Sequence, residues 1–145
     1  MKISGTYTLP LAQEQAYAVM QDPEVLARAI PGCESLEKTG PDEYRMKMKM
    51  ALASLSGAFE GKVRITEQTP PNSFRLVVEG TGRIGFVKGD GLLKLKSVEG
   101  GTEVAYEGDA QVGGTIAAVG QRLIDGTAKT MIKKFFDKLA AEATS

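Results

Sequence analysis

The stretch YRMKMKMAL, residues 44–52, alternates between apolar and cationic side chains at every second position. The apolar positions are Tyr44, Met46, Met48, Met50 and Leu52, and the cationic positions are Arg45, Lys47 and Lys49. This alternation predicts a β-strand with one apolar face and one solvent-facing side. Methionine is unbranched and polarizable, so it adapts to irregular or changing shapes. A strand face with three methionines therefore favours a pocket wall for a flexible, lipophilic molecule.

The same period of two continues through the following segments, and their apolar faces are rich in glycine. The expected inward residues are Gly57, Phe59, Gly61, Val63, Ile65; Phe74, Leu76, Val78, Gly80, Gly82; Val87, Gly89, Gly91, Leu93, Leu95; and Val104, Tyr106, Gly108, Ala110, Val112. Inward glycines either bend a coiled sheet or leave volume above it. The two effects are compatible, because a sheet that curls sharply encloses a hollow.

The composition indicates one globular domain, residues 1–145. The chain has 145 residues, of which 42% are hydrophobic and 25% charged, and its formal net charge is zero. A neutral chain gives no general preference for nucleic acid. Met1 to Pro10 lacks the apolar segment of a signal peptide. We expect a cytoplasmic protein, with peripheral contact at the inner face of the cell membrane left open.

Histidine is absent, and Cys33 is the one cysteine. A histidine-containing catalytic triad and a zinc site of cysteine and histidine are therefore excluded. The commonest general base near neutral pH is missing as well. We expect a non-catalytic protein without a metal or cofactor. Cys33 has Glu34 beside it and no adjacent cation, so we expect a half-buried thiol of low reactivity.

The order of predicted elements is one strand, two short helices, about six strands and a long helix. The first three elements are expected over Lys2–Leu9, Ala12–Met20 and Pro23–Ala29, with Asp22 as the N-cap of the second helix. A strand follows over Cys33–Lys38. This order predicts an α+β fold in which a curved antiparallel sheet of about seven strands wraps around the C-terminal helix.

The C-terminal segment, from Thr115 to Ala143, has helical period, with Thr115 as a candidate N-cap. One side of this expected helix comprises Ile116, Val119, Gly120, Leu123, Ile124, Thr127, Met131, Phe135 and Leu139. Gly120 and Gly126 lower its helix propensity by about 1 kcal/mol each. Either close packing on the first helices or a flexible first half explains them. Lys134 and Lys138, on either side of Phe136, suggest a second, weaker interpretation as a membrane contact.

Three stretches carry a family resemblance: DPEVLARAIPGCESLEKTGPDEY (residues 22–44), GAFEGKVRITEQTPP (57–71) and AQVGGTIAAVGQRLIDGTAKTMIKKFF (110–136). The sequence resembles the carbon monoxide dehydrogenase CoxG family, which belongs to the START-like (SRPBCC) helix-grip superfamily. The likeness runs from Gly5 to about Leu139. It implies a helix-grip fold with a deep cavity between the sheet and the long helix.

The resemblance also implies a non-catalytic accessory of a molybdenum hydroxylase of the carbon monoxide dehydrogenase type. Family members are thought to couple that enzyme to the membrane and its quinone pool, which implies menaquinone or ubiquinone as the class of ligand. Many members carry a C-terminal hydrophobic or amphipathic tail. This sequence ends at Ala-Glu-Ala-Thr-Ser, residues 141–145, which argues against a membrane anchor of its own.

Gly80-Thr81-Gly82-Arg83-Ile84-Gly85 spells G-x-G-x-x-G, the fingerprint of dinucleotide-binding loops. Such a site needs a strand before the motif and a helix after it. Here strand pattern lies on both sides, so we predict a β-hairpin. Phe86 and Val87 follow as an apolar pair. They are either an ordinary surface pair or a gate and contact at the cavity mouth.

The predicted ligand-binding residues are those expected to face the space between the sheet and the long helix. They are Tyr44, Met46, Met48, Met50, Phe59, Phe74, Leu76, Phe86, Ile116, Val119, Leu123 and Met131. Tyr7, Tyr44 and Tyr106 all fall inward by strand parity. One of these hydroxyls is suited to orient an apolar ligand through a carbonyl oxygen, as an isolated polar group does in many pockets.

Three functions remain open at this point. The leading one is a carrier that encloses a lipophilic molecule, with an isoprenoid quinone as the favoured ligand. The second is a cyclase- or lyase-like enzyme, which requires a carboxylate or tyrosine directed into the cavity. The third is a protein-interaction or assembly module with a filled core. A pocket with an apolar lining favours the first and a solid interior favours the third.

Overall fold

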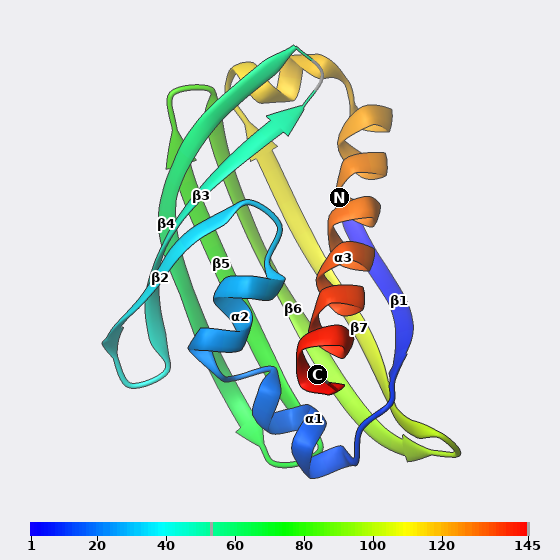
Figure 1. Ribbon diagram of the computed structural model, residues 1–145. Coiled ribbons are helices and arrows are strands. Elements are labelled where there is room, and N and C mark those ends of the chain that lie inside the picture. Colours follow the sequence, from blue (N-terminus) through cyan, green and yellow to red (C-terminus); the bar gives the residue numbers. More distant parts are fainter. Residues whose placement is uncertain (53, 145) are drawn as a thin grey trace.

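The computed structural model describes residues 1–52 and 54–144. Two short helices follow the first strand, six further strands form a meander, and a short 3₁₀ helix precedes the long C-terminal helix (Figure 1). The elements are β1 (Lys2–Leu9), α1 (Gln13–Val19), α2 (Pro23–Ala29), β2 (Cys33–Gly40), β3 (Glu43–Leu52), β4 (Leu55–Thr69), β5 (Ser73–Gly82), β6 (Gly85–Val98), β7 (Gly101–Gly113), η1 (Thr115–Val119) and α3 (Gln121–Thr144).

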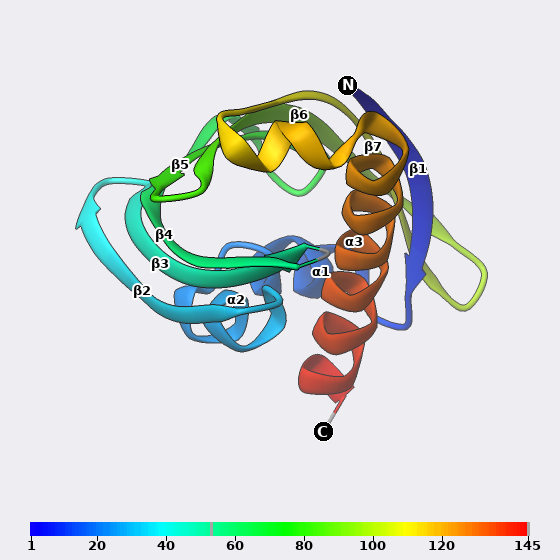
Figure 2. The ribbon, with the colours of Figure 1, turned by 90° about the horizontal axis from the view of Figure 1, so that it is seen from above.

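The strands form one antiparallel seven-stranded sheet in the order β1-β7-β6-β5-β4-β3-β2. The sheet curves strongly, and α3 lies across the open side of the curve (Figure 2). The predicted fold class, with its strand number, its two early helices and its long C-terminal helix, is confirmed. β1 has the predicted bounds, and β2 extends two residues beyond the predicted end at Lys38.

The period of two predicted the buried face of the sheet correctly. On β3, Tyr44, Met46 and Met48 are buried, Met50 is half-buried, and the charged residues between them are exposed. Met46 is opposite Gly61 and Met48 is opposite Phe59 on β4. The methionine strand therefore forms one wall of the interior, with its cationic side on the outer surface.

Two of the inward glycines explain how the sheet curls. A Cβ atom on Gly61 would lie 1.8 Å from the carbonyl oxygen of Glu79, and one on Gly108 would lie 2.4 Å from that of Asp90. Real Cβ atoms never approach so closely, so these positions require glycine because adjacent backbones meet there. Gly80, in contrast, has ordinary spacing to its neighbours. Bending therefore accounts for part of the glycine content.

Helix α1 closes one end of the sheet through polar side chains. The Gln13 amide nitrogen donates hydrogen bonds to the carbonyl oxygens of Pro71 (2.9 Å) and Leu95 (3.1 Å). The Tyr17 hydroxyl donates to the Ser73 carbonyl oxygen (3.0 Å), and the buried Thr102 hydroxyl donates to that of Leu11 (2.8 Å). These bonds join α1 to the β4–β5 and β6–β7 turns.

Helix α2 begins as predicted. The Asp22 side chain accepts a hydrogen bond from the backbone nitrogen of Glu24, and Pro23 occupies the first turn. Leu26 and Ala29 are buried, and Arg28 forms an ion pair with Glu142 of α3 (2.8 Å). Helix α2 is therefore a support for the C-terminal half of α3.

The prediction of one continuous helix from Thr115 was wrong. Residues Thr115–Val119 form a 3₁₀ helix whose N-cap is Gly114, and α3 starts only at Gln121. Gly120 separates the two with a φ of 103°. An L-residue with a Cβ atom rarely adopts this backbone conformation, so Gly120 breaks the helix.

The C-terminal half of α3 enters the core through Phe136 and Leu139, which are 3% and 0% exposed. The Phe136 ring stacks on Tyr7 (5.0 Å between centroids) and on Tyr106 (5.6 Å). This burial contradicts the interpretation of Phe136 as a membrane contact. The predicted helix face named Phe135, which is half-buried and packs edge-on against Phe136.

Replacing Phe136 by alanine is expected to lower the free energy of unfolding by about 3 kcal/mol or more, because it removes a buried ring. Phe86→Ala is the matched control, since the Phe86 side chain is 37% exposed and its loss should cost about 1 kcal/mol or less. Urea denaturation measures both. Equal losses would contradict the central position of Phe136.

Candidate ligand-binding site

An open pocket of about 810 Å³ lies between the end of β3, the α2–β2 connection and the first half of α3. It follows one flank of α3 over several turns. Its lining comprises Pro31, Gly32, Lys49, Met50, Ala51, Val119, Gly120, Arg122, Leu123, Gly126, Thr127, Thr130, Met131 and Lys134. The sheet side is available because β2 ends its pairing at Met48, leaving the last residues of β3 without a neighbouring strand on that side.

The lining is apolar inside and cationic at its rim. Met50 and Met131 are half-buried, and Leu123 is 42% exposed. Lys49 and Lys134 are both exposed. Among the described residues that line this pocket there is no carboxylate. The arrangement is suited to an apolar molecule, and it offers no acid or base for proton transfer.

The structure brings some of the predicted ligand-binding residues together at this pocket and leaves others elsewhere. Met50, Val119, Leu123 and Met131 line it. A second group lies in the buried core, namely Tyr44, Met46, Met48, Phe59, Phe74 and Ile116. Leu76 is half-buried against that core. Phe86 lies on the outer face of β6 over Gly113, away from the pocket lining.

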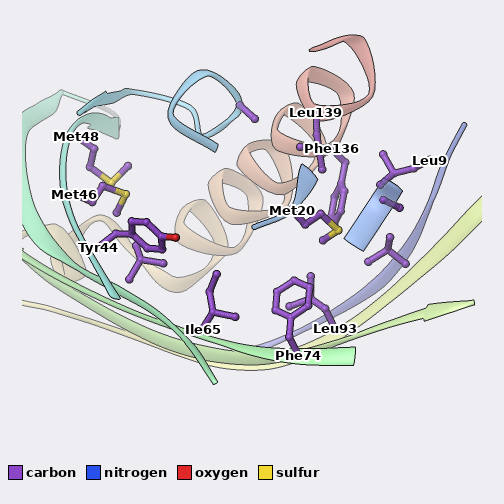
Figure 3. Close-up of a cluster of buried hydrophobic side chains, with 14 of the residues drawn as sticks. Leu9, Met20, Tyr44, Met46, Met48, Ile65, Phe74, Leu93, Phe136 and Leu139 are labelled. Carbon is purple, nitrogen blue, oxygen red and sulfur yellow. The ribbon is translucent and has the colours of Figure 1, made fainter. Parts of the chain in front are cut away.

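The residues of β3 connect the pocket to the core. From Met50 at the pocket, the buried side chains of Met48, Met46 and Tyr44 follow along the same face (Figure 3). Tyr44 is 5% exposed and its hydroxyl points into the space between the sheet and the helices. No hydrogen bond joins this hydroxyl to another residue of the described chain, and burial raises the pKa of Tyr44.

Sequence reasoning missed the α3 residues that border the pocket between the apolar positions. Gly126, Thr127 and Thr130 line it, and the Thr130 hydroxyl donates a hydrogen bond to the Gly126 carbonyl oxygen (3.0 Å). A Cβ atom on Gly126 would have no atom within 4 Å, so close packing on the first helices does not explain this glycine. Its presence in an otherwise helical segment was the available signal.

The Pro31-Gly32 pair was predicted only to end a helix, and it also borders the pocket. Gly32 has a φ of 77°, and a Cβ atom there would lie 2.1 Å from the Lys49 carbonyl oxygen. Cys33 is half-buried, and its thiol donates a weak hydrogen bond to the Ser35 carbonyl oxygen (3.5 Å). Burial raises the pKa of Cys33, which agrees with the expected low reactivity.

A second pocket, of about 570 Å³, lies on the opposite flank of α3, against β1. Tyr7, Tyr106 and Phe136 form its aromatic base. The Tyr7 hydroxyl donates to the Asp137 carboxylate (2.7 Å), which also accepts from Lys133 (2.7 Å). The first half of α3 is therefore bordered by a pocket on each flank.

The G-x-G-x-x-G segment is a β-hairpin, as predicted. Gly82 on β5 pairs with Gly85 on β6, and no helix follows. Ile84 at its tip is 8% exposed, and its carbonyl oxygen accepts a hydrogen bond from the Ile116 backbone nitrogen (2.7 Å). The hairpin anchors η1. Among the described residues, no group of three or more His, Cys, Asp or Glu could hold a metal ion.

Gly126→Ala is expected to raise the free energy of unfolding by about 1 kcal/mol, because Gly126 is helical and the new Cβ atom meets open space. Gly120→Ala is the contrasting variant. Its Cβ atom also meets open space, but the φ of 103° should make it destabilising by about 1 kcal/mol or more. Urea denaturation gives both values. The same sign for the two variants would contradict this account of the helix break.

The hydrogen bond to Asp137, together with burial, raises the pKa of Tyr7 from 10.0 to about 12. The folded protein therefore holds this proton more tightly than the unfolded chain. The stabilisation is complete below pH 10 and is lost as the pH rises through 12. Spectrophotometric titration at alkaline pH should detect Tyr7 as a late-titrating tyrosine, and Asp137→Asn should lower its pKa. An unchanged titration in Asp137→Asn would refute this cause.

In the described part of the chain, every helix is too short or too polar to cross a membrane. None of the curated proteins compared with the chain matches it. A solved structure of a conserved protein from Geobacillus kaustophilus has 33% sequence identity and a TM-score of 0.94, covering 99% of this chain and 95% of that one.

More distant structures share the fold. Protein Ms6760 from Mycobacterium smegmatis has 16% identity and a TM-score of 0.72, with 99% of this chain and 90% of that one covered. The Zhui aromatase/cyclase from Streptomyces sp. R1128 has 12% identity and a TM-score of 0.70, with 99% and 93% covered. The family model of the carbon monoxide dehydrogenase component CoxG matches residues 5–144. The chain therefore belongs to the CoxG family and has a helix-grip fold.

Proposed function

We propose that this protein is a non-catalytic carrier that holds a lipophilic small molecule, an isoprenoid quinone of the menaquinone or ubiquinone class, between its sheet and α3. The observation that carries the proposal is the apolar pocket that continues along β3 into the methionine-lined interior. Its volume of about 810 Å³ falls in the range of roughly 300–1,000 Å³ that is usual for small-molecule sites.

The methionines support an apolar ligand of variable shape. Met46, Met48 and Met50 line one strand face, and Met131 faces the pocket from α3. Their unbranched side chains change rotamer more easily than leucine or isoleucine. Each Å² of apolar surface removed from water contributes about 25 cal/mol, so an isoprenoid chain gains affinity without any catalytic group.

Tyr44 is the group suited to orient the quinone ring. Its hydroxyl lies inside the interior without a hydrogen-bond partner in the described chain, and a quinone carbonyl oxygen is an acceptor. At a strand rise of about 3.4 Å per residue, Tyr44 and Met50 lie about 20 Å apart. A ring at Tyr44 would therefore leave a track along the methionines for the isoprenoid tail, which would leave through the pocket.

The lining supports a carrier more than an enzyme of the cyclase or lyase type. Such chemistry needs an acid or base that faces the bound molecule. The described lining of the larger pocket contains no carboxylate. The Tyr7 hydroxyl, at the second pocket, is bound to Asp137.

The family supports a physiological partner. Because the chain belongs to the CoxG family, the partner in this proposal is a molybdenum hydroxylase of the carbon monoxide dehydrogenase type. The carrier would take quinone to that enzyme or remove the reduced form from it. Its place would be the cytoplasm, in peripheral contact with the inner face of the cell membrane.

Tyr44→Phe should weaken binding of a short-chain menaquinone analogue about three- to tenfold, because one hydrogen bond to a carbonyl oxygen is lost. Isothermal titration calorimetry measures the affinity. Tyr7→Phe is the matched control, because it removes a hydroxyl that Asp137 already engages, and it should bind like the wild type. Equal affinities of wild type and Tyr44→Phe would remove Tyr44 from the site.

The pocket itself is tested with two substitutions of Met50. Met50→Glu places a charge in the apolar lining and should abolish binding of the analogue, whereas Met50→Leu preserves the apolar surface and should retain it. Circular dichroism confirms that both variants fold. Undiminished binding by folded Met50→Glu would contradict the proposed site.

A further inference from the structure

One end of the molecule carries no carboxylate. The tips of the β3–β4 and β5–β6 hairpins and the connection from β7 through η1 into α3 comprise residues 50–59, 80–89 and 110–124. None of these residues is Asp or Glu, and three are cations: Arg83, Lys88 and Arg122. In a chain with equal numbers of acidic and basic residues, this is a local excess of positive charge.

The three segments are joined in space, as their contacts show. The Ile84 carbonyl oxygen accepts from the Ile116 backbone nitrogen, and the Ile84 side chain lies 3.3 Å from the position of a Cβ atom on Gly57. Residues 49–51 of β3 and Val119 to Leu123 line the same pocket. We define residues 50–59, 80–89 and 110–124 as the carboxylate-free end, which is at the top of Figure 1.

The exposed apolar side chains lie at the same end. Among the described residues, the exposed large hydrophobic side chains are Phe86 (37%) and Leu123 (42%). Leu123 follows Arg122 on α3, and Lys88 lies 5.9 Å from the centroid of the Phe86 ring. Neither Arg83 nor Arg122 forms an ion pair with another described residue. These cations therefore remain available to an external anion.

The opposite end has a different charge character. It contains α1, the start of α2 and the β2–β3, β4–β5 and β6–β7 turns (Figure 1). Carboxylates occur in each of these segments, for example Glu14, Glu24, Asp42, Glu67 and Glu99. The charge of the molecule is thus asymmetric from end to end, although its total is zero.

We infer that the carboxylate-free end docks on the surface of an anionic phospholipid bilayer. This inference rests on the proposed carrier function, and it names the surface from which the carrier exchanges its ligand. Each basic residue near an anionic bilayer contributes about 1 kcal/mol, and exposed apolar side chains insert between the headgroups. Leu123 belongs both to this end and to the pocket lining. Docking therefore places the pocket beside the bilayer, so that a lipophilic ligand passes between them with little exposure to water.

The chemistry fits a bilayer better than an acidic protein surface. A protein partner would pair with the cations but offer no general acceptor for separated apolar side chains such as Phe86 and Leu123. A bilayer accepts both without a fixed geometry.

The test is co-sedimentation of the protein with vesicles, either of phosphatidylcholine alone or of equal amounts of phosphatidylcholine and phosphatidylglycerol. The wild-type protein should bind the mixed vesicles at low salt, bind less as salt rises, and bind phosphatidylcholine vesicles at least tenfold more weakly. The Arg83→Glu/Arg122→Glu variant should lose at least tenfold in binding to the mixed vesicles.

The matched control is Lys38→Glu/Lys94→Glu, which makes the same change in net charge away from the carboxylate-free end. This control should retain most of the binding. Arg83→Gln/Arg122→Gln, with a milder change, should show an intermediate loss, and circular dichroism verifies that each variant folds. Equal losses in the two charge-reversed variants, or no binding of the wild type to mixed vesicles at low salt, would overturn the inference.

The carrier proposal is measured separately. Titration of the wild-type protein with a short-chain menaquinone in the absence of vesicles shows whether the ligand binds. A protein that binds the quinone but not the mixed vesicles retains the carrier function and refutes docking. A protein that binds the vesicles but no quinone refutes the carrier function and leaves the docking surface intact.

Discussion

A single helix has to cover the apolar face of a seven-stranded sheet. With about 4.8 Å between neighbouring strands, such a sheet is about 29 Å across, whereas a helix with its side chains is about 10 Å wide. Curvature, made possible by close backbone contacts at Gly61 and Gly108, reduces this mismatch but does not remove it. The C-terminal half of α3 is fixed by Phe136, Leu139 and α2, whereas its first half has a pocket on each flank. The pockets are a consequence of how little a single helix can cover.

The chemical character of the larger pocket follows from the residues that border the uncovered area. Met50 and Met131 supply an apolar, deformable surface from two elements, and Lys49 and Lys134 lie at its rim. A rigid, fully packed interior would use branched side chains, which hold one rotamer more strictly. Gly126 adds a position where the helix is weakened without any packing reason. These features agree with a site that changes shape when a ligand enters.

Much of the fold was predictable because sheet alternation is a local property. The bounds of β1, the buried face of β3 and the cap at Asp22 all follow from residue type and spacing. The site was less predictable. The break at Gly120 depends on a backbone angle, and the burial of Phe136 depends on two tyrosines far away in the sequence. Gln13 closes the opposite end through carbonyl groups that no sequence pattern marks. Of the predicted ligand-binding residues, those on α3 and Met50 border the open pocket, because parity says which face a residue is on but not how deep it lies.

Native mass spectrometry of the purified protein, followed by analysis of its solvent extract for quinones and other lipids, tests the central claim most directly. The account predicts one lipophilic molecule per chain, released by organic solvent and identified as an isoprenoid quinone. The contradictory result is a protein that is purified empty and also takes up neither added menaquinone nor added ubiquinone analogues. That result would favour a protein-interaction module over a carrier.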